Sequence, residues 1–80
     1  METRVAIVAI IVQSGNSVEK INGFLHEYGE HIIGRMGLPY RQKGINIISI
    51  VMDAPHDVIS ALSGKIGRLE NVSVKTVYST

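Results

Sequence analysis

The sequence contains no cysteine among its 80 residues, and this absence excludes three kinds of chemistry. Without thiols the chain forms no disulfide, no thiolate metal site and no cysteine nucleophile. An excess of one charge is missing too, since eight basic residues stand against seven acidic ones and the formal net charge is +1. A general nucleic-acid-binding protein normally has a concentrated basic face, so we expect no direct nucleic-acid binding.

Sequence motifs for catalysis are also missing. The chain has no Gly-x-Ser-x-Gly nucleophile elbow and no Gly-Lys-Ser/Thr phosphate loop. Its carboxylates are scattered over the expected helix ends and loops, where capping accounts for them. We therefore expect a protein that is not an enzyme and uses no cofactor.

No apolar run is long enough to span a bilayer. The longest run has about the length of the apolar region of a secretory signal peptide. Residues 5–12 are all apolar and follow Arg4. The run is far shorter than the ~20 residues that span a bilayer, and no small-x-small cleavage site follows it. We interpret it as a buried strand of a cytoplasmic protein without membrane association.

The remaining pattern predicts a single domain over residues 1–80. Val- and Ile-rich segments predict strands, because β-branched side chains favour extended backbone. Apolar residues at intervals of three and four predict helices. The expected elements are a strand over residues 4–13, a helix over 16–28, a strand over 30–36, a strand over 45–52, a helix over 53–67 and a strand over 71–78.

Polar residues, glycines and prolines mark the expected boundaries. Asn16 is the expected N-cap of the first helix, and Gly29 is expected as the left-handed residue that ends it. Asp53 is the expected cap of the second helix, with Pro55 in its first turn. Residues 37–39 and Gly44 are expected to bound a connection between strands.

The element order predicts an α+β, ferredoxin-like βαββαβ fold, with a four-stranded antiparallel sheet and two helices on one face. The first and third strands are the most apolar, so we expect them at the centre of the sheet. Their side chains are apolar on both faces: Ile7 and Ile11 alternate with Val8 and Ile10. Two helices cover only one face, so we expect a second copy of the chain to cover the other, in a dimer or tetramer.

Two histidines raise the question of a metal site. His26 and His31 lie five residues apart with Gly29 between them, whereas a zinc-binding helix needs a spacing of four. We favour a helix-surface histidine and an edge-strand histidine, and keep a small metal-binding protein as an alternative.

Two segments are candidate ligand sites. Arg35, Arg41 and Lys43 gather near Tyr40 at an expected turn, which is either a solvated basic hairpin tip or an anion or partner contact. The turn at residues 14–16 either caps a helix or offers free N–H groups to an anion. The candidate ligand-binding residues are Ser14, Gly15, Asn16, Arg35, Tyr40 and Arg41.

Several blocks of sequence resemble the iron-only ([FeFe]) hydrogenase system regulator family, over nearly the whole chain. The most specific is Gly-Arg-Met-Gly-Leu-Pro-Tyr-Arg at residues 34–41, with further similarity at 25–29, 44–49 and 53–62. That family is similar in fold to ACT domains and to the nickel-sensing domain of nickel-responsive repressors. The resemblance implies a ligand-responsive regulatory module, with a ligand near Ser14, Gly15 and Asn16 at a subunit interface.

The resemblance also implies a regulatory role connected with hydrogenase genes. The sequence has no helix-turn-helix or ribbon-helix-helix segment, so any effect on transcription would pass through a small-molecule effector or a protein partner. A purely structural oligomerisation module remains an alternative.

Overall fold

The computed structural model describes residues 2–13 and 16–79, without the side chain of Asn16. Its order confirms the predicted βαββαβ arrangement. The elements are β1 (Arg4–Val12), α1 (Asn16–Glu27), β2 (Ile32–Tyr40), β3 (Ile45–Ala54), α2 (His56–Gly67) and β4 (Val72–Tyr78), with 3₁₀ turns at Gly29–His31 and Arg41–Lys43. Within this part of the chain no helix is long and apolar enough to cross a membrane.

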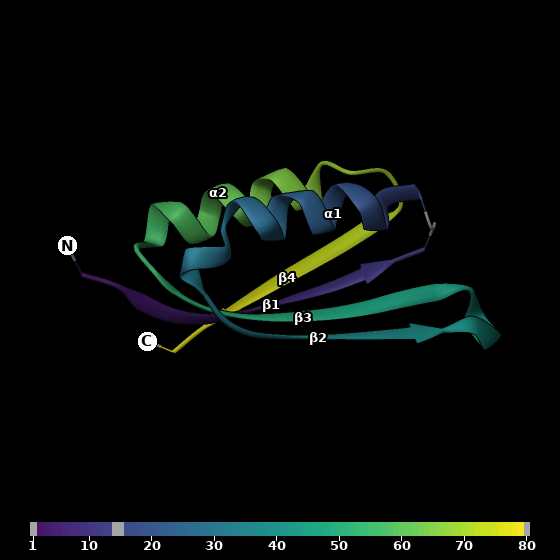
Figure 1. The fold of residues 1–80 in the computed structure, drawn as a ribbon, viewed down its shortest axis with the longest axis horizontal. Coiled ribbons are helices and arrows are strands. Elements are labelled where there is room, and N and C mark those ends of the chain that lie inside the picture. The colour runs from purple at the N-terminus through teal and green to yellow at the C-terminus, as the bar shows by residue number, and fades with distance from the viewer. Residues whose placement is uncertain (1, 14–15, 80) are drawn as a thin grey trace.

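The four strands form one antiparallel sheet in the order β2-β3-β1-β4, and both helices lie on the same face of it (Figure 1). The two most apolar strands, β1 and β3, are central, as predicted. The more polar strands β2 and β4 form the edges, where charged side chains discourage pairing with other chains.

The core lies between the helices and one face of the sheet. Alternate residues of β1 point into it: Val8, Ile10 and Val12 are each at most 1% exposed. Ile21 and Ile59 pack against them from α1 and α2 without measurable exposure. Side chains alternate between faces along a strand, so the intervening residues of β1 point to the uncovered face.

The second strand is longer than predicted. The predicted strand ends at Met36, but β2 continues to Tyr40 and includes Gly37, Leu38 and Pro39. Proline is tolerated here because β2 is an edge strand, where a missing N–H costs no ladder hydrogen bond. The connection is the shorter Arg41–Lys43 turn, and Gly44 closes it with a φ of 63°, a conformation that suits glycine.

Two expected helix ends are wrong. Asp53 does not cap α2, because β3 runs on to Ala54 and Pro55 takes the N-cap position. Central strand pairing with β1 holds Asp53 opposite Val5, which extends the strand past the predicted boundary. Gly29 is not left-handed; it begins the 3₁₀ turn Gly29–His31 that leads the chain down to β2.

Candidate functional site

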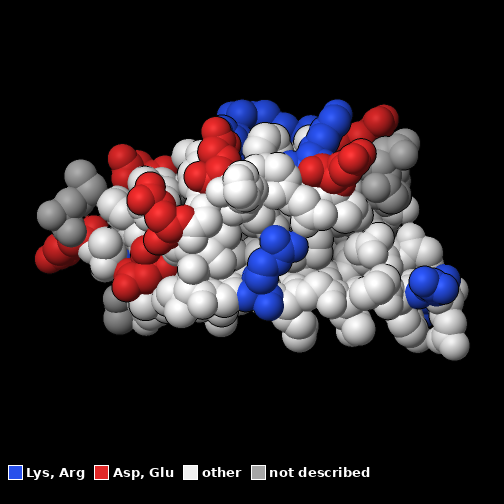
Figure 2. Space-filling view, in the orientation of Figure 1, with Lys and Arg blue, Asp and Glu red and all other residues white. Residues whose placement is uncertain are grey.

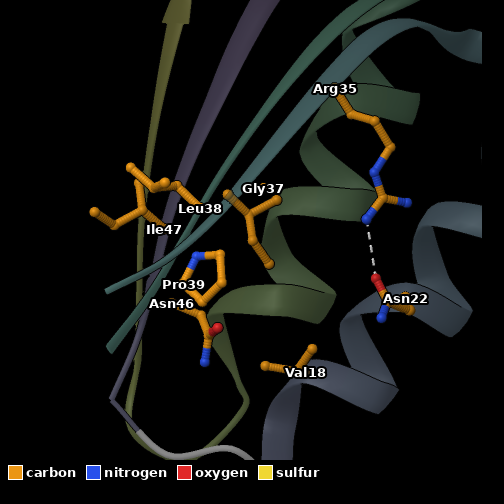
Figure 3. Close-up of a pocket in the computed structure, with 9 residues that line it drawn as sticks. Val18, Asn22, Arg35, Gly37, Leu38, Pro39, Asn46 and Ile47 are labelled. Atoms are coloured by element: carbon orange, nitrogen blue, oxygen red, sulfur yellow. Dashed lines mark hydrogen bonds between the residues drawn. The ribbon is translucent and has the colours of Figure 1, made fainter. Parts of the chain in front are cut away.

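A groove of about 220 Å³ opens between α1 and the β2–β3 hairpin (Figure 3). It arises because the two helices do not cover the far end of the long hairpin, where β2 and β3 extend past α1 (Figure 1). The lining residues are Val18, Asn22, Arg35, Gly37, Leu38, Pro39, Asn46, Ile47 and Ile48.

Arg35 is the one charged side chain among the lining residues. Its position on β2 is opposite Ile50, a core residue, so the register turns its side chain toward the helices. Arg35 Nη2 donates a hydrogen bond to Asn22 Oδ1 of α1 at 3.0 Å, shown by the dashed line in Figure 3. A guanidinium has five N–H donors, so this contact orients the group and leaves others for a ligand.

Asn46 supplies a second polar group on the floor of the groove. It lies opposite Pro39 on β2 and opposite Val12 on β1, on the helix-facing side of the sheet. In Figure 3 the Pro39 ring, the Asn46 amide and Val18 surround the opening, while Leu38 and Ile47 point to the other side of the sheet. The groove therefore combines a cation, two amides and an apolar wall.

The predicted basic cluster is not a single site. Arg35 contacts α1, whereas Arg41 begins the hairpin turn, six residues or about 20 Å further along extended backbone. Figure 2 shows basic side chains at two separate places along the sheet layer. Tyr40 is also outside the groove, and its hydroxyl donates to Gln42 Oε1 at 3.0 Å.

The other predicted residues lie at the start of α1. Ser14 and Gly15 are outside the described residues, and Asn16 is described only as the first residue of α1. Val18 in the first turn of α1 lines the groove, so the groove opens beside the helix end that the resemblance favoured.

Sequence reasoning missed Asn22 and Asn46. Asn22 is a polar residue on an exposed helix surface, where nothing in the sequence distinguishes it. Asn46 could have been recognised as unusual, because asparagine is depleted in strands and here it lies inside the strongly apolar strand β3.

The two histidines do not come together. His26 is in the last turn of α1, and His31 ends the following 3₁₀ turn, with its Nε2 3.7 Å from Glu30 Oε1. Within residues 2–13 and 16–79, no three side chains of the metal-ligating types cluster.

Lys65 joins the two helices outside the groove. Its ammonium donates to Glu27 Oε1 at 3.3 Å and lies 5.0 Å from the centre of the Tyr28 ring. The hydrogen bond to the Tyr28 side chain, followed by the one to Glu27, raises the pKa of Lys65 above its ordinary value. This partly exposed contact stabilises the helix layer weakly and is remote from the groove.

The fold and the groove define a class: a ferredoxin-like domain of two helices on a four-stranded sheet, with a small polar groove under one helix. The chain belongs to the TM1266-like family, whose model matches residues 4–76 and carries the provisional description "iron-only hydrogenase system regulator". The uncharacterized protein TM1266 from Thermotoga maritima is 38% identical, with a TM-score of 0.94 over 99% of this chain and all of that one. The predicted family is confirmed.

More distant structures share the fold alone. A formyltetrahydrofolate deformylase from Pseudomonas putida KT2440 is 14% identical, with a TM-score of 0.66 over 91% of this chain and 28% of that one. CPII, a nitrogen regulatory PII-like protein from Thiomonas intermedia K12, is 14% identical, with a TM-score of 0.53 over the full length of both chains. A search of curated proteins found no match.

Proposed function

We propose that this chain is a non-catalytic, cytoplasmic regulatory domain of the iron-only hydrogenase system that responds to a small organic anion held in the groove. The family match supports the connection with hydrogenase. The groove supports the proposed ligand binding, because it places a guanidinium group, two amides and an apolar wall around one small space.

The observation that carries the proposal is the Arg35–Asn22 hydrogen bond across the groove. It fixes the direction of the guanidinium before any ligand arrives, which lowers the entropy cost of binding. A guanidinium pairs bidentately with a carboxylate, and no acidic residue among the lining residues competes for it. We infer that the ligand carries a carboxylate.

The volume limits the size of that ligand. Pockets for drug-sized ligands measure roughly 300–1,000 Å³, whereas this groove measures about 220 Å³. The apolar wall of Val18, Pro39 and Ile48 suits a short aliphatic portion. The ligand class is therefore a short-chain carboxylate with a polar substituent within reach of Asn46.

A ligand in this place would act on two elements at once. It would contact α1 through Asn22 and Val18 and the edge strand β2 through Arg35, and so tie the helix to the sheet edge. A protein partner that binds this edge would then distinguish the loaded domain from the empty one. Any effect on transcription passes through such a partner.

Calorimetric titration tests the ligand class. The probes are propanoate, lactate and 2-oxobutanoate, with propanamide as the uncharged match of propanoate. We expect the carboxylates to bind and propanamide not to bind, and Arg35→Ala to abolish binding. Arg68→Ala, which removes an exposed arginine outside the groove, is the matched control and should bind as the parent does.

A purely structural interaction module is the second candidate, favoured by the exposed apolar face of the sheet. It predicts that none of the carboxylates binds, while the chain still assembles. Binding that is unchanged in Arg35→Ala would contradict the proposed groove site.

A further inference from the structure

The sheet face away from the helices is apolar and uncovered. Ile7 is 45% exposed, Ile11 42%, Leu38 52% and Val77 63%. The strand register places these side chains on one continuous surface, which runs across all four strands. In Figure 2 the lower, sheet side of the molecule is mostly white, with basic side chains near its middle and at one end. Monomers rarely expose an apolar surface of this extent.

The size of the face fits an interface. The molecule measures 42 × 18 × 17 Å along its principal axes, and the sheet spans the long direction. The strands are about 25–30 Å long, so the face has a flat projection of roughly 500 Å². The relief of its side chains brings the accessible area nearer to the ~800 Å² per partner that a stable protein interface buries.

The face has a regular relief. Ala9 on β1 lies opposite Ser49 on β3, and these two small side chains form a shallow trough at the centre of the sheet, between Met36 on β2 and Lys75 on β4. Ile11 and Ile47 form a ridge on one side of the trough. Ile7 and Val51 form a second ridge on the other side. The face therefore contains both a ridge and a trough that can receive one.

The charges at the two ends of the face are opposite. Asp53 is exposed on β3 beyond the Ile7 ridge, opposite Val5. The turn Arg41–Lys43 lies beyond the Ile11 ridge and carries two exposed basic residues. Between these ends the described residues of the face include one charged side chain, Lys75 on the edge strand β4.

We propose that a second copy of this chain covers the face, sheet against sheet, about a two-fold axis that lies across the strands between the trough and the Ile11 ridge. Each Ile11–Ile47 ridge then enters the Ala9–Ser49 trough of the other copy. Sheets packed in this way are ~10 Å apart, with their strands within about 30° of alignment.

This position of the axis agrees with three further features of the face. It sets Lys75 of one copy over Ser73 of the other, at an edge where the ammonium reaches water. It sets Tyr40 over Gly34, a large side chain over a position without one. It also brings Asp53 of each copy to the basic turn of the other, which forms two equivalent ion pairs.

Other two-fold arrangements lose these contacts. An axis along the strands would place ridge on ridge and Asp53 over the apolar Val5. An axis between the trough and the Ile7 ridge would place Asp53 over Ile47, which buries an unpaired carboxylate. Charge and shape thus select the same register.

Sedimentation velocity at micromolar concentration, with no ligand added, tests the assembly. The parent chain should be a dimer, or a tetramer built from it. Ile11→Glu should weaken the dimer at least about 100-fold, because two-fold symmetry buries two new carboxylates. Ser60→Glu adds the same charge on the exposed surface of α2 and should not change the assembly. A monomeric parent, or an unaffected Ile11→Glu variant, overturns the proposal.

Two further variants test the register itself. Ala9→Leu fills the trough and should weaken the dimer about tenfold or more, although it makes the face more apolar. If the association were unspecific, Ala9→Leu would strengthen it instead, and that result would overturn the proposed register. Lys43→Glu should weaken the dimer, and Lys43→Glu with Asp53→Lys should restore it; failure of the restoration rejects the proposed axis. Each variant is first checked for a cooperative melt.

The assembly and the groove are independent in these experiments. A dimer that forms without carboxylate binding rejects the ligand proposal alone, and carboxylate binding by a monomer rejects the dimer alone.

Discussion

The two faces of the sheet are built from nearly the same residue types and have opposite surroundings. Ile10 and Ile11 are neighbours in β1, yet Ile10 is 1% exposed beneath the helices and Ile11 is 42% exposed on the other side. Composition therefore says little about which face a helix covers. What distinguishes the faces is their relation to the connections, because both crossover helices return on the same side of the sheet.

The difference also separates the two proposed sites. The helix-covered face holds the core and, at its uncovered end, the groove with Arg35. None of the polar side chains of the groove lies on the open face, and that face is available for assembly. Substitutions at matched positions on the two faces should therefore produce different kinds of defect.

The largest effect is expected from a buried carboxylate. Ile48→Glu places a charge in the core, where Ile48 is 5% exposed, and should prevent stable folding. Its neighbour Ile47 points to the open face, so Ile47→Glu should fold and lose only the dimer. Circular dichroism and sedimentation measure the two outcomes. Equal loss of folding in both variants would remove the distinction between the faces.

A smaller contrast is expected from truncation. Ile10→Ala leaves a cavity in the core and should lower the free energy of unfolding by about 3 kcal/mol. Ile11→Ala removes the same atoms from the open face and should cost about 1 kcal/mol or less in the monomer. Urea denaturation at the lowest workable protein concentration measures both, because dimer formation would add to the apparent stability.

The groove offers a third contrast, between two arginines. Arg35→Ala should abolish carboxylate binding and change the free energy of unfolding by less than about 0.5 kcal/mol, because the side chain is exposed. Arg41→Ala should leave carboxylate binding unchanged, since Arg41 lies in the turn outside the groove. Its effect should appear in the dimer instead. Calorimetry with propanoate would contradict the assignment if both variants bound equally.

The smallest effect concerns the helix layer. The pKa of Lys65 is raised in the folded chain by Tyr28 and Glu27, so the contact stabilises the fold while the lysine is protonated. This contribution is complete below the ordinary lysine pKa and disappears as the pH rises through the raised value. Lys65→Met should lower the melting temperature slightly at neutral pH and lose that difference in strong alkali, as thermal melts at the two pH values would show.

Much of the fold could be predicted because it depends on local patterns. The apolar runs at residues 5–12 and 45–52 identified the central strands, since only central strands are buried by neighbours on both edges. The three- and four-residue spacing of Ile21 and Leu25 identified the buried side of α1. These signals lie within one element and need no knowledge of its neighbours.

The site could be predicted only in part. Arg35 was identified by its charge in a distinctive block, but the structure places Arg41 outside the groove because the hairpin is longer than its glycines suggested. Pro39 reads as a turn residue in sequence and is tolerated in β2 because that strand is at the edge of the sheet. Whether a strand lies at the edge or at the centre is decided only when the sheet assembles.

The sequence by itself determined the element order, the central strands and the apolar character of both sheet faces, because residue type and periodicity act over a few neighbouring residues. Tertiary structure alone decided the rest. Strand register brought Arg35 and Asn46 to one groove, and the packing of α1 on the sheet added Asn22. The same register aligned Ala9 with Ser49 and set Asp53 and the basic turn at opposite ends of the open face. Contacts between residues so far apart in the chain depend on how strands pair, and no local pattern encodes that pairing.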